Sequence, residues 1–163
     1  MIPHSWFFTL KLASALGCGL VAGVFFAFST FVMKALGQRP PDQGMAAMQA
    51  INITVINVWF MGALFGTAIA CLGLGIATLL QGNSPGTGYL LGGSLLYLTG
   101  TILVTIVVHV PLNNALADTI PNSPEGTMLW SRYLASWTLW NHLRTVAALA
   151  SAALFTLAIA LDP

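Results

Sequence analysis

Side chains able to do acid–base chemistry are concentrated in two short blocks of this sequence. The blocks read "HVPLNNAL" and "WNHLRT", and both lie within or beside long apolar runs. Their histidines, asparagines and arginine are His109, Asn113, Asn114, Asn141, His142 and Arg144. An imidazole exchanges protons near neutral pH, whereas guanidinium and amide groups stabilise negative charge on oxygen. The two blocks therefore predict a site that removes a proton and holds the resulting oxyanion.

Aromatic residues accompany the second block and predict a slot for a flat apolar molecule. Tyr133, Trp137 and Trp140 precede the Asn-His-x-Arg sequence by less than four helical turns. Indole and phenol rings combine an apolar face with one polar group, which suits them to bind planar ligands. We expect these three rings, together with His109 and Asn57, to bind the substrate.

Carboxylates are missing from the predicted site. The acidic residues all fall in connections or at the terminus, and they are Asp42, Asp118, Glu125 and Asp162. A carboxylate-bridged metal centre or a pair of catalytic acids is therefore not supported. We predict no cofactor; the alternative is a metal ion held by His109 and His142 with an asparagine or water.

The composition indicates which elements must position these side chains. Only 6% of the 163 residues are charged and 57% are hydrophobic, which is typical of a membrane protein. A hydrocarbon core of about 30 Å needs about 20 helical residues. Four stretches satisfy this length, and they are residues 6–33, 53–80, 89–110 and 137–161. We predict a single all-α domain over residues 1–163, an up-down-up-down bundle of four transmembrane helices. No basic run suggests a nucleic-acid partner.

The third predicted span carries a stripe of polar side chains. Tyr97, Thr101, Thr105, His109 and Asn113 recur every four residues and should face the bundle interior. The alternative for the threonines is hydrogen bonding to their own helix. The antiparallel fourth span would bring the second block to the same depth as the lower part of this stripe.

Arg144 is the most demanding group in these spans. Burying its guanidinium costs at least a few kcal/mol unless it finds partners. The alternative is that the long side chain reaches back to the membrane surface. The neighbouring histidine, asparagine and tryptophan residues favour a pocket.

Two further patterns concern packing. Two prolines precede a short amphipathic helix between the first and second spans, with Met45, Met48 and Ile51 on one face, suited to the membrane interface. Gly62 and Gly66, like a stripe of small residues in the first span, predict close helix packing. The same small-residue faces suit a homo-oligomer.

Several blocks resemble the anthrone oxygenase family, a large set of small four-span bacterial and fungal membrane proteins. They are "VPLNNALA" (110–117), "WSRYLASWTLWNHLRTVAALA" (130–150), and "FFAFSTFVMKAL" followed by "PPDQGMAAMQAIN" (40–52). The resemblance covers nearly the whole chain, and "PLNNAL" and "WNHLRT" are its most specific parts. The sequence departs from the expected pattern at His109, where we expect asparagine, and near Lys34, where we expect proline.

The resemblance implies an activity and residue roles. Family members oxidise anthrones to anthraquinones with O₂, without a conventional metal or flavin. The resemblance implies that His142 is the base that removes a proton from the substrate. It also implies that Arg144, with Asn113 or Asn114, holds the enolate oxygen. Asn141 completes the expected catalytic set. The alternative is a non-catalytic membrane protein that binds a lipid, a quinone or a protein partner in the same pocket.

The expected location is the lipid bilayer of a bacterial inner membrane. Lys34, Arg39 and Arg132 lie on the pocket side of the predicted bundle, against Lys11 and the terminal amine on the other side. By the positive-inside rule, this excess predicts that the pocket faces the cytoplasm.

Overall fold

The computed structural model describes residues 4–82 and 85–161, and every regular element in these ranges is helical. Four segments are long and apolar enough to cross a membrane: Trp6–Gly37, Val58–Gln81, Thr87–Ala117 and Pro124–Ala160. The predicted all-α class and the four spans are confirmed, and the chain is an integral membrane protein. The ends of the predicted domain, residues 1–3 and 162–163, lie outside the described residues.

Only the second and fourth segments are uninterrupted α-helices. The first segment contains α1 (His4–Ala27), the π-helix η1 (Phe28–Val32) and α2 (Met33–Gly37). It is followed by the short helix α3 (Pro41–Thr54) and the second span, α4 (Val58–Gln81). The third segment contains α5 (Thr87–Leu96), the π-helices η2 (Tyr97–Leu103) and η3 (Thr105–His109), and α6 (Val110–Ala117). The fourth is α7 (Pro124–Ala160).

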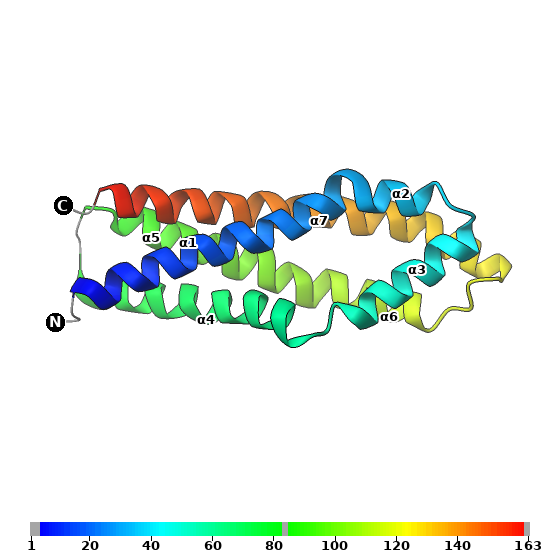
Figure 1. Ribbon diagram of the computed structural model, residues 1–163, viewed down its shortest axis with the longest axis horizontal. Coiled ribbons are helices and arrows are strands. Elements are labelled where there is room, and N and C mark those ends of the chain that lie inside the picture. Colours follow the sequence, from blue (N-terminus) through cyan, green and yellow to red (C-terminus); the bar gives the residue numbers. More distant parts are fainter. Residues whose placement is uncertain (1–3, 83–84, 162–163) are drawn as a thin grey trace.

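The four long segments lie side by side, and successive segments run in opposite directions (Figure 1). α1 packs against α4 and α7, and α5 packs against the same two helices. As a result, α1 begins and α7 ends at one end of the molecule, while α3 and α6 lie at the other (Figure 1). The first polar sequence block lies at the end of η3 and in α6, and the second lies in the middle of α7.

The unequal helix lengths divide the molecule into a membrane-spanning part and a cap. α4 has 24 residues, about 36 Å, which suits a bilayer, whereas α7 has 37 residues and is about 55 Å long. α2, α3, α6 and the first part of α7 extend beyond the start of α4 (Figure 1). They enclose a second apolar core, separate from that of the spans, which includes Met45, Met48, Leu116, Trp130 and Tyr133.

Several predicted boundaries are therefore corrected, including the end of the third span, which runs to Ala117 rather than to residue 110. The fourth helix begins at Pro124 rather than at residue 137, because Trp130, Tyr133 and Trp137 are buried on one helix face and keep the polar sequence between them helical. The second span begins at Val58 rather than at residue 53. The predicted amphipathic helix is present as α3, but its face with Met45 and Met48 packs against protein rather than lying free at the interface.

The predicted close packing at small-residue stripes is wrong. A Cβ atom added at Gly62, Gly66, Gly19 or Gly23 would meet open space. The helices approach closely at other glycines, because an added Cβ at Gly100 of η2 would overlap the Cβ of Ala147 on α7. The spacing of small residues identified a face of the helix but not the neighbour that it meets.

Gly100→Ala is expected to destabilise the protein by about 1–3 kcal/mol, because the two backbones would have to separate at a packed helix crossing. Thermal unfolding in detergent would measure the loss. Gly66→Ala is the matched control and should leave the melting temperature within error of the wild type. Equal melting temperatures for the two variants would contradict the packing described at Gly100.

Candidate functional site

One hollow of about 220 Å³ lies where the spans meet the cap, and it is called the cavity below. Its polar lining residues are Asn52, Thr105, His109, Asn113 and Arg144. Its aromatic lining residues are Phe25, Phe28, Phe60, Phe65 and Trp137. The cavity thus combines flat apolar walls with one imidazole and one guanidinium.

Arg144 is a buried residue of α7. Among the described residues, the groups that contact its guanidinium are uncharged. Nη1 donates to Oγ1 of Thr105 at 3.1 Å and Nη2 donates to Oδ1 of Asn141 at 2.7 Å. The guanidinium carbon lies 4.1 Å from the ring centre of Phe25 and 5.3 Å from that of Trp137. Nε has no hydrogen-bond partner within the described protein. The positive charge is held in place without being neutralised, so this site attracts an anion.

Asn141 holds the guanidinium of Arg144 in position but does not line the cavity. Its Nδ2 donates to the backbone oxygen of Phe25 at 2.7 Å and to Oγ of Ser29 at 2.8 Å. The acceptors are at the junction of α1 and η1. Because both amide hydrogens are engaged across the α1–α7 contact, the amide oxygen is oriented toward the guanidinium. Asn141 is therefore a positioning residue.

His109 ends η3 and is almost completely buried. Its ring meets Trp137 edge-on, with the ring centres 5.1 Å apart. Nδ1 lies 3.5 Å from the backbone oxygen of Val104, a long contact that favours a proton on Nδ1. Nε2 has no hydrogen-bond partner within the described protein, although the backbone of Trp137 lies close to the ring. With this tautomer, Nε2 carries the lone pair that a base requires.

The predicted polar stripe of the third span does face the interior. Tyr97, Thr101 and His109 are buried, and Thr105 and Asn113 are half-buried. A spacing of four residues is slightly more than one turn of an α-helix and slightly less than one turn of a π-helix. Because the third segment contains both kinds of helix, the two deviations offset each other and the stripe stays on one face. Thr105 also donates to the backbone oxygen of Thr101 at 2.7 Å, as the alternative for the threonines predicted.

Asn113 forms the outer wall of the cavity. Its Oδ1 accepts hydrogen bonds from Oη of Tyr133 at 2.8 Å and from Nε1 of Trp137 at 3.1 Å. Nδ2 of Asn52 is 3.5 Å from the same tyrosine oxygen. Tyr133 is buried beside Trp130 and supports Asn113 rather than lining the cavity.

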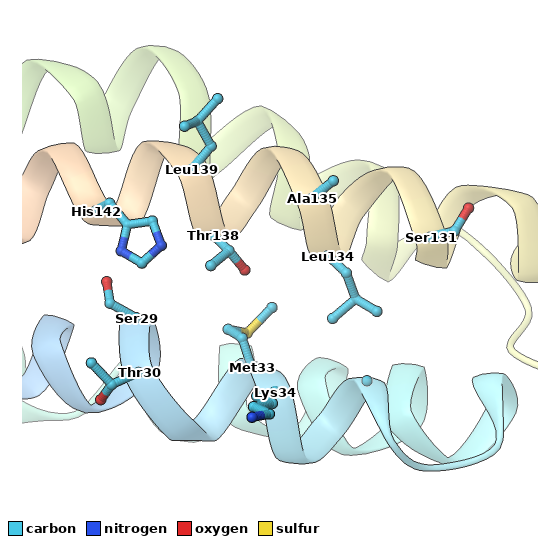
Figure 2. Close-up of a pocket in the computed structure, with 11 residues that line it drawn as sticks. Ser29, Thr30, Met33, Lys34, Ser131, Leu134, Ala135, Thr138, Leu139 and His142 are labelled. Atoms are coloured by element: carbon cyan, nitrogen blue, oxygen red, sulfur yellow. The ribbon is translucent and has the colours of Figure 1, made fainter.

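His142 lies outside the cavity, which corrects the predicted convergence. It is exposed and lines a groove of about 650 Å³ between the first segment and α7. Figure 2 shows its ring facing Ser29 across this groove, with Thr138 beside it. Adjacent residues on a helix differ by about 100° in direction, so His142 points away from the face that carries Asn141. His109 and His142 therefore line different hollows.

Three other predicted site residues also lie outside the cavity. Trp140 is partly exposed on α7, and Asn114 is exposed on α6. Asn57 is the N-cap of α4, where its Oδ1 accepts hydrogen bonds from the backbone nitrogens of Trp59 and Phe60. This capping role is structural.

The aromatic residues that the first two spans contribute to the cavity were not predicted from the sequence. Phe25 lies against the guanidinium, and Phe28 packs on Trp137 with ring centres 5.6 Å apart. Phe60 meets Phe25 edge-on from α4. The three-residue spacing of Phe25 and Phe28, which puts both rings near one helix face, was the available signal.

The matched part of the chain includes most of these polar residues. A family model described as anthrone oxygenase matches residues 56–154, more than half of the chain. The chain belongs to the anthrone oxygenase family. The match contains the cavity's His109, Asn113 and Arg144, whereas the walls contributed by α1 and α3 lie outside it. No curated protein and no solved structure matches this member of the family.

Proposed function

We propose that this anthrone oxygenase family member oxidises a flat aromatic ketone of the anthrone type with O₂, in the cavity between α1, α4, α7 and the third segment. The family name supports the reaction class. The residue roles rest on the cavity itself, and the substrate class rests on the family.

One observation carries the proposal: a buried guanidinium and an imidazole, each with an unpartnered nitrogen, line one apolar cavity. Nε of Arg144 and Nε2 of His109 have no partner within the described protein. Positive charge with no carboxylate among its contacts in the described residues favours a ligand that becomes anionic during the reaction. The imidazole supplies a base. His109 therefore takes the role of proton acceptor that the family resemblance implied for His142.

In the proposed reaction, the CH₂ group of the anthrone becomes the second carbonyl of an anthraquinone. His109 removes one methylene proton, and Arg144 stabilises the enolate oxygen. The enolate transfers one electron to O₂, and the resulting radical and superoxide combine to form a C–O bond. The peroxide takes the proton back from His109. Loss of the remaining C–H proton then breaks the O–O bond and releases hydroxide, which takes up that proton. One anthrone and one O₂ thus give one anthraquinone and one water.

The size and lining of the cavity support a small flat substrate. Its volume of about 220 Å³ is below the roughly 300–1,000 Å³ of pockets for drug-sized ligands. Its walls include Phe25 and Trp137, which suit contact with the faces and edges of aromatic rings. Because the enolate reacts with O₂ directly, the proposed reaction requires neither flavin nor metal.

The test is oxygen uptake by the purified protein in lipid nanodiscs with anthrone as substrate. Anthrones autoxidise, so the enzyme-free rate is subtracted and an anaerobic sample is run in parallel. We expect equal amounts of O₂ consumed and anthraquinone formed, with the metal content of the same sample below stoichiometric. Anthraquinone binding without uptake above the enzyme-free rate would instead favour a non-catalytic quinone- or lipid-binding protein.

A further inference from the structure

A second hollow adjoins the cavity on its outer side. This outer hollow, of about 650 Å³, lies between α3 and the third segment. Four residues line both the cavity and the outer hollow, and they are Asn52, Ile56, Val110 and Asn113. Because they share these walls, the two hollows adjoin across these four side chains, and the place where they adjoin is here called the mouth.

The backbone departs from regular α-helix on both sides of the mouth. On one side α3 ends at Thr54 and α4 begins at Val58, so a short connection replaces helix packing. On the other side η3 ends at His109 and α6 begins at Val110, with Pro111 in its first turn. A proline cannot donate a backbone hydrogen bond, and its ring crowds the preceding turn. Both walls of the mouth therefore depart from a regular α-helix here, the first by a connection and the second by a change from π-helix to α-helix.

The surroundings of the mouth are apolar and unusually exposed. Ile53, Ile56 and Trp59 are 75%, 71% and 85% exposed. Such a patch is unfavourable in water but suited to lipid. Tryptophan concentrates where hydrocarbon meets headgroups, and Trp59 lies in the first turn of α4, the helix whose length matches the bilayer. The outer hollow therefore opens at the edge of the hydrocarbon layer.

We propose that the aromatic ligand reaches the cavity sideways from the bilayer, through the mouth between Ile56 and Val110. Asn113, fixed by Tyr133 and Trp137, forms the rigid side of this passage. The amides of Asn52 and Asn113 offer hydrogen bonds to a carbonyl oxygen as the ring passes. The choice of an aromatic ligand rests on the proposed function, whereas the route rests on the geometry of the two hollows.

The route is tested by narrowing the mouth and measuring binding rates. The probe is aminoanthraquinone, a fluorescent analogue of the product that does not react with O₂, added to the protein in nanodiscs. In Ile56→Trp and Val110→Trp, we expect both the association rate and the dissociation rate to fall by about tenfold. A narrowed passage has this signature because it slows ligand movement in both directions.

Val107→Trp is the matched control. Val107 is 61% exposed, lies less than one turn from Val110, and lines neither the cavity nor the outer hollow. It should leave both rates at their wild-type values. Wild-type rates in both mouth variants, or an equal slowing in Val107→Trp, would overturn the proposed route.

The source of the ligand is tested with aminoanthraquinone joined to a hexadecyl chain, which stays in the bilayer. This probe should bind the wild type and be slowed by Val110→Trp. If the free probe binds and the lipid-bound probe does not, access from the bilayer is overturned. A wild type that binds neither probe would also overturn it. Anthrone turnover is measured separately, so binding through the mouth without oxygen uptake would refute the proposed function and leave the route intact.

Discussion

Replacing Arg144 with glutamine is expected to lower anthrone-dependent oxygen uptake by about 100- to 1,000-fold, the loss typical when a preorganised oxyanion donor is removed. The guanidinium is held by Thr105 and Asn141 and lies against aromatic rings. Its positive charge is therefore in place before the enolate forms. Glutamine keeps a polar side chain of moderate length but provides no charge.

The matched control is Arg132→Gln, which removes an exposed arginine from the same helix and should change the rate less than about twofold. Aminoanthraquinone binding and thermal unfolding are measured on the same samples. We expect Arg144→Gln to retain binding, because the quinone is uncharged.

Arg144→Lys separates charge from shape at the same position. Lysine keeps the charge but loses the planar fork that contacts Thr105 and Asn141 together. We expect a rate between those of the wild type and Arg144→Gln. Wild-type turnover in Arg144→Gln would contradict the oxyanion role, and so would loss of folding in both variants, which would make the arginine structural.

The sequence predicted the spans and the polar stripe because both depend on short-range patterns. Hydropathy identifies the segment that needs lipid, and a four-residue spacing places Tyr97 through Asn113 on one face. It also predicted that Arg144 and Asn113 would lie together. These conclusions needed only the direction of each span and the depth of each residue.

Depth alone could not assign the correct face of α7. Asn141, His142 and Arg144 differ by a few ångströms in depth, but His142 points toward the groove with Ser29. The buried face follows Tyr133, Trp137, Asn141 and Arg144. That face is set by packing against α1 and the third segment. Because α7 carries apolar residues on all sides, its sequence does not show which face is buried.

Hydropathy also failed where helices continue beyond the membrane. The predicted fourth span began at residue 137, yet α7 begins at Pro124, capped by a hydrogen bond from the backbone nitrogen of Gly126 to Oγ of Ser123. This extension belongs to the cap, whose helices α3 and α6 provide one wall of the cavity. Its existence depends on the buried methionines and aromatic rings of the second core rather than on hydropathy.

His109→Ala is expected to reduce anthrone-dependent oxygen uptake by about 100- to 10,000-fold, the usual contribution of a positioned general base. Nε2 of this buried imidazole has no partner within the described protein, and the ring lines the same cavity as Arg144. The ring is held edge-on against Trp137, which fixes its position in the wall of the cavity.

His142→Ala is the matched control, because it removes the exposed imidazole from the other side of α7. We expect its rate to stay within about twofold of the wild type, as is usual for exposed positions away from the reacting atoms. The pair of variants thus compares two histidines that the sequence alone made comparable candidates.

Added imidazole distinguishes a missing base from a damaged cavity. In His109→Ala the space left by the ring adjoins the substrate, so millimolar imidazole should restore part of the oxygen uptake, whereas a void that only weakens packing would not respond in this way. Aminoanthraquinone binding by the same variant checks that the cavity persists. Should His142→Ala lose its turnover while His109→Ala keeps it, the base belongs to the groove beside Ser29. Should both variants turn over normally, the enolate forms without a protein base, and Arg144 alone would account for the rate enhancement by stabilising it.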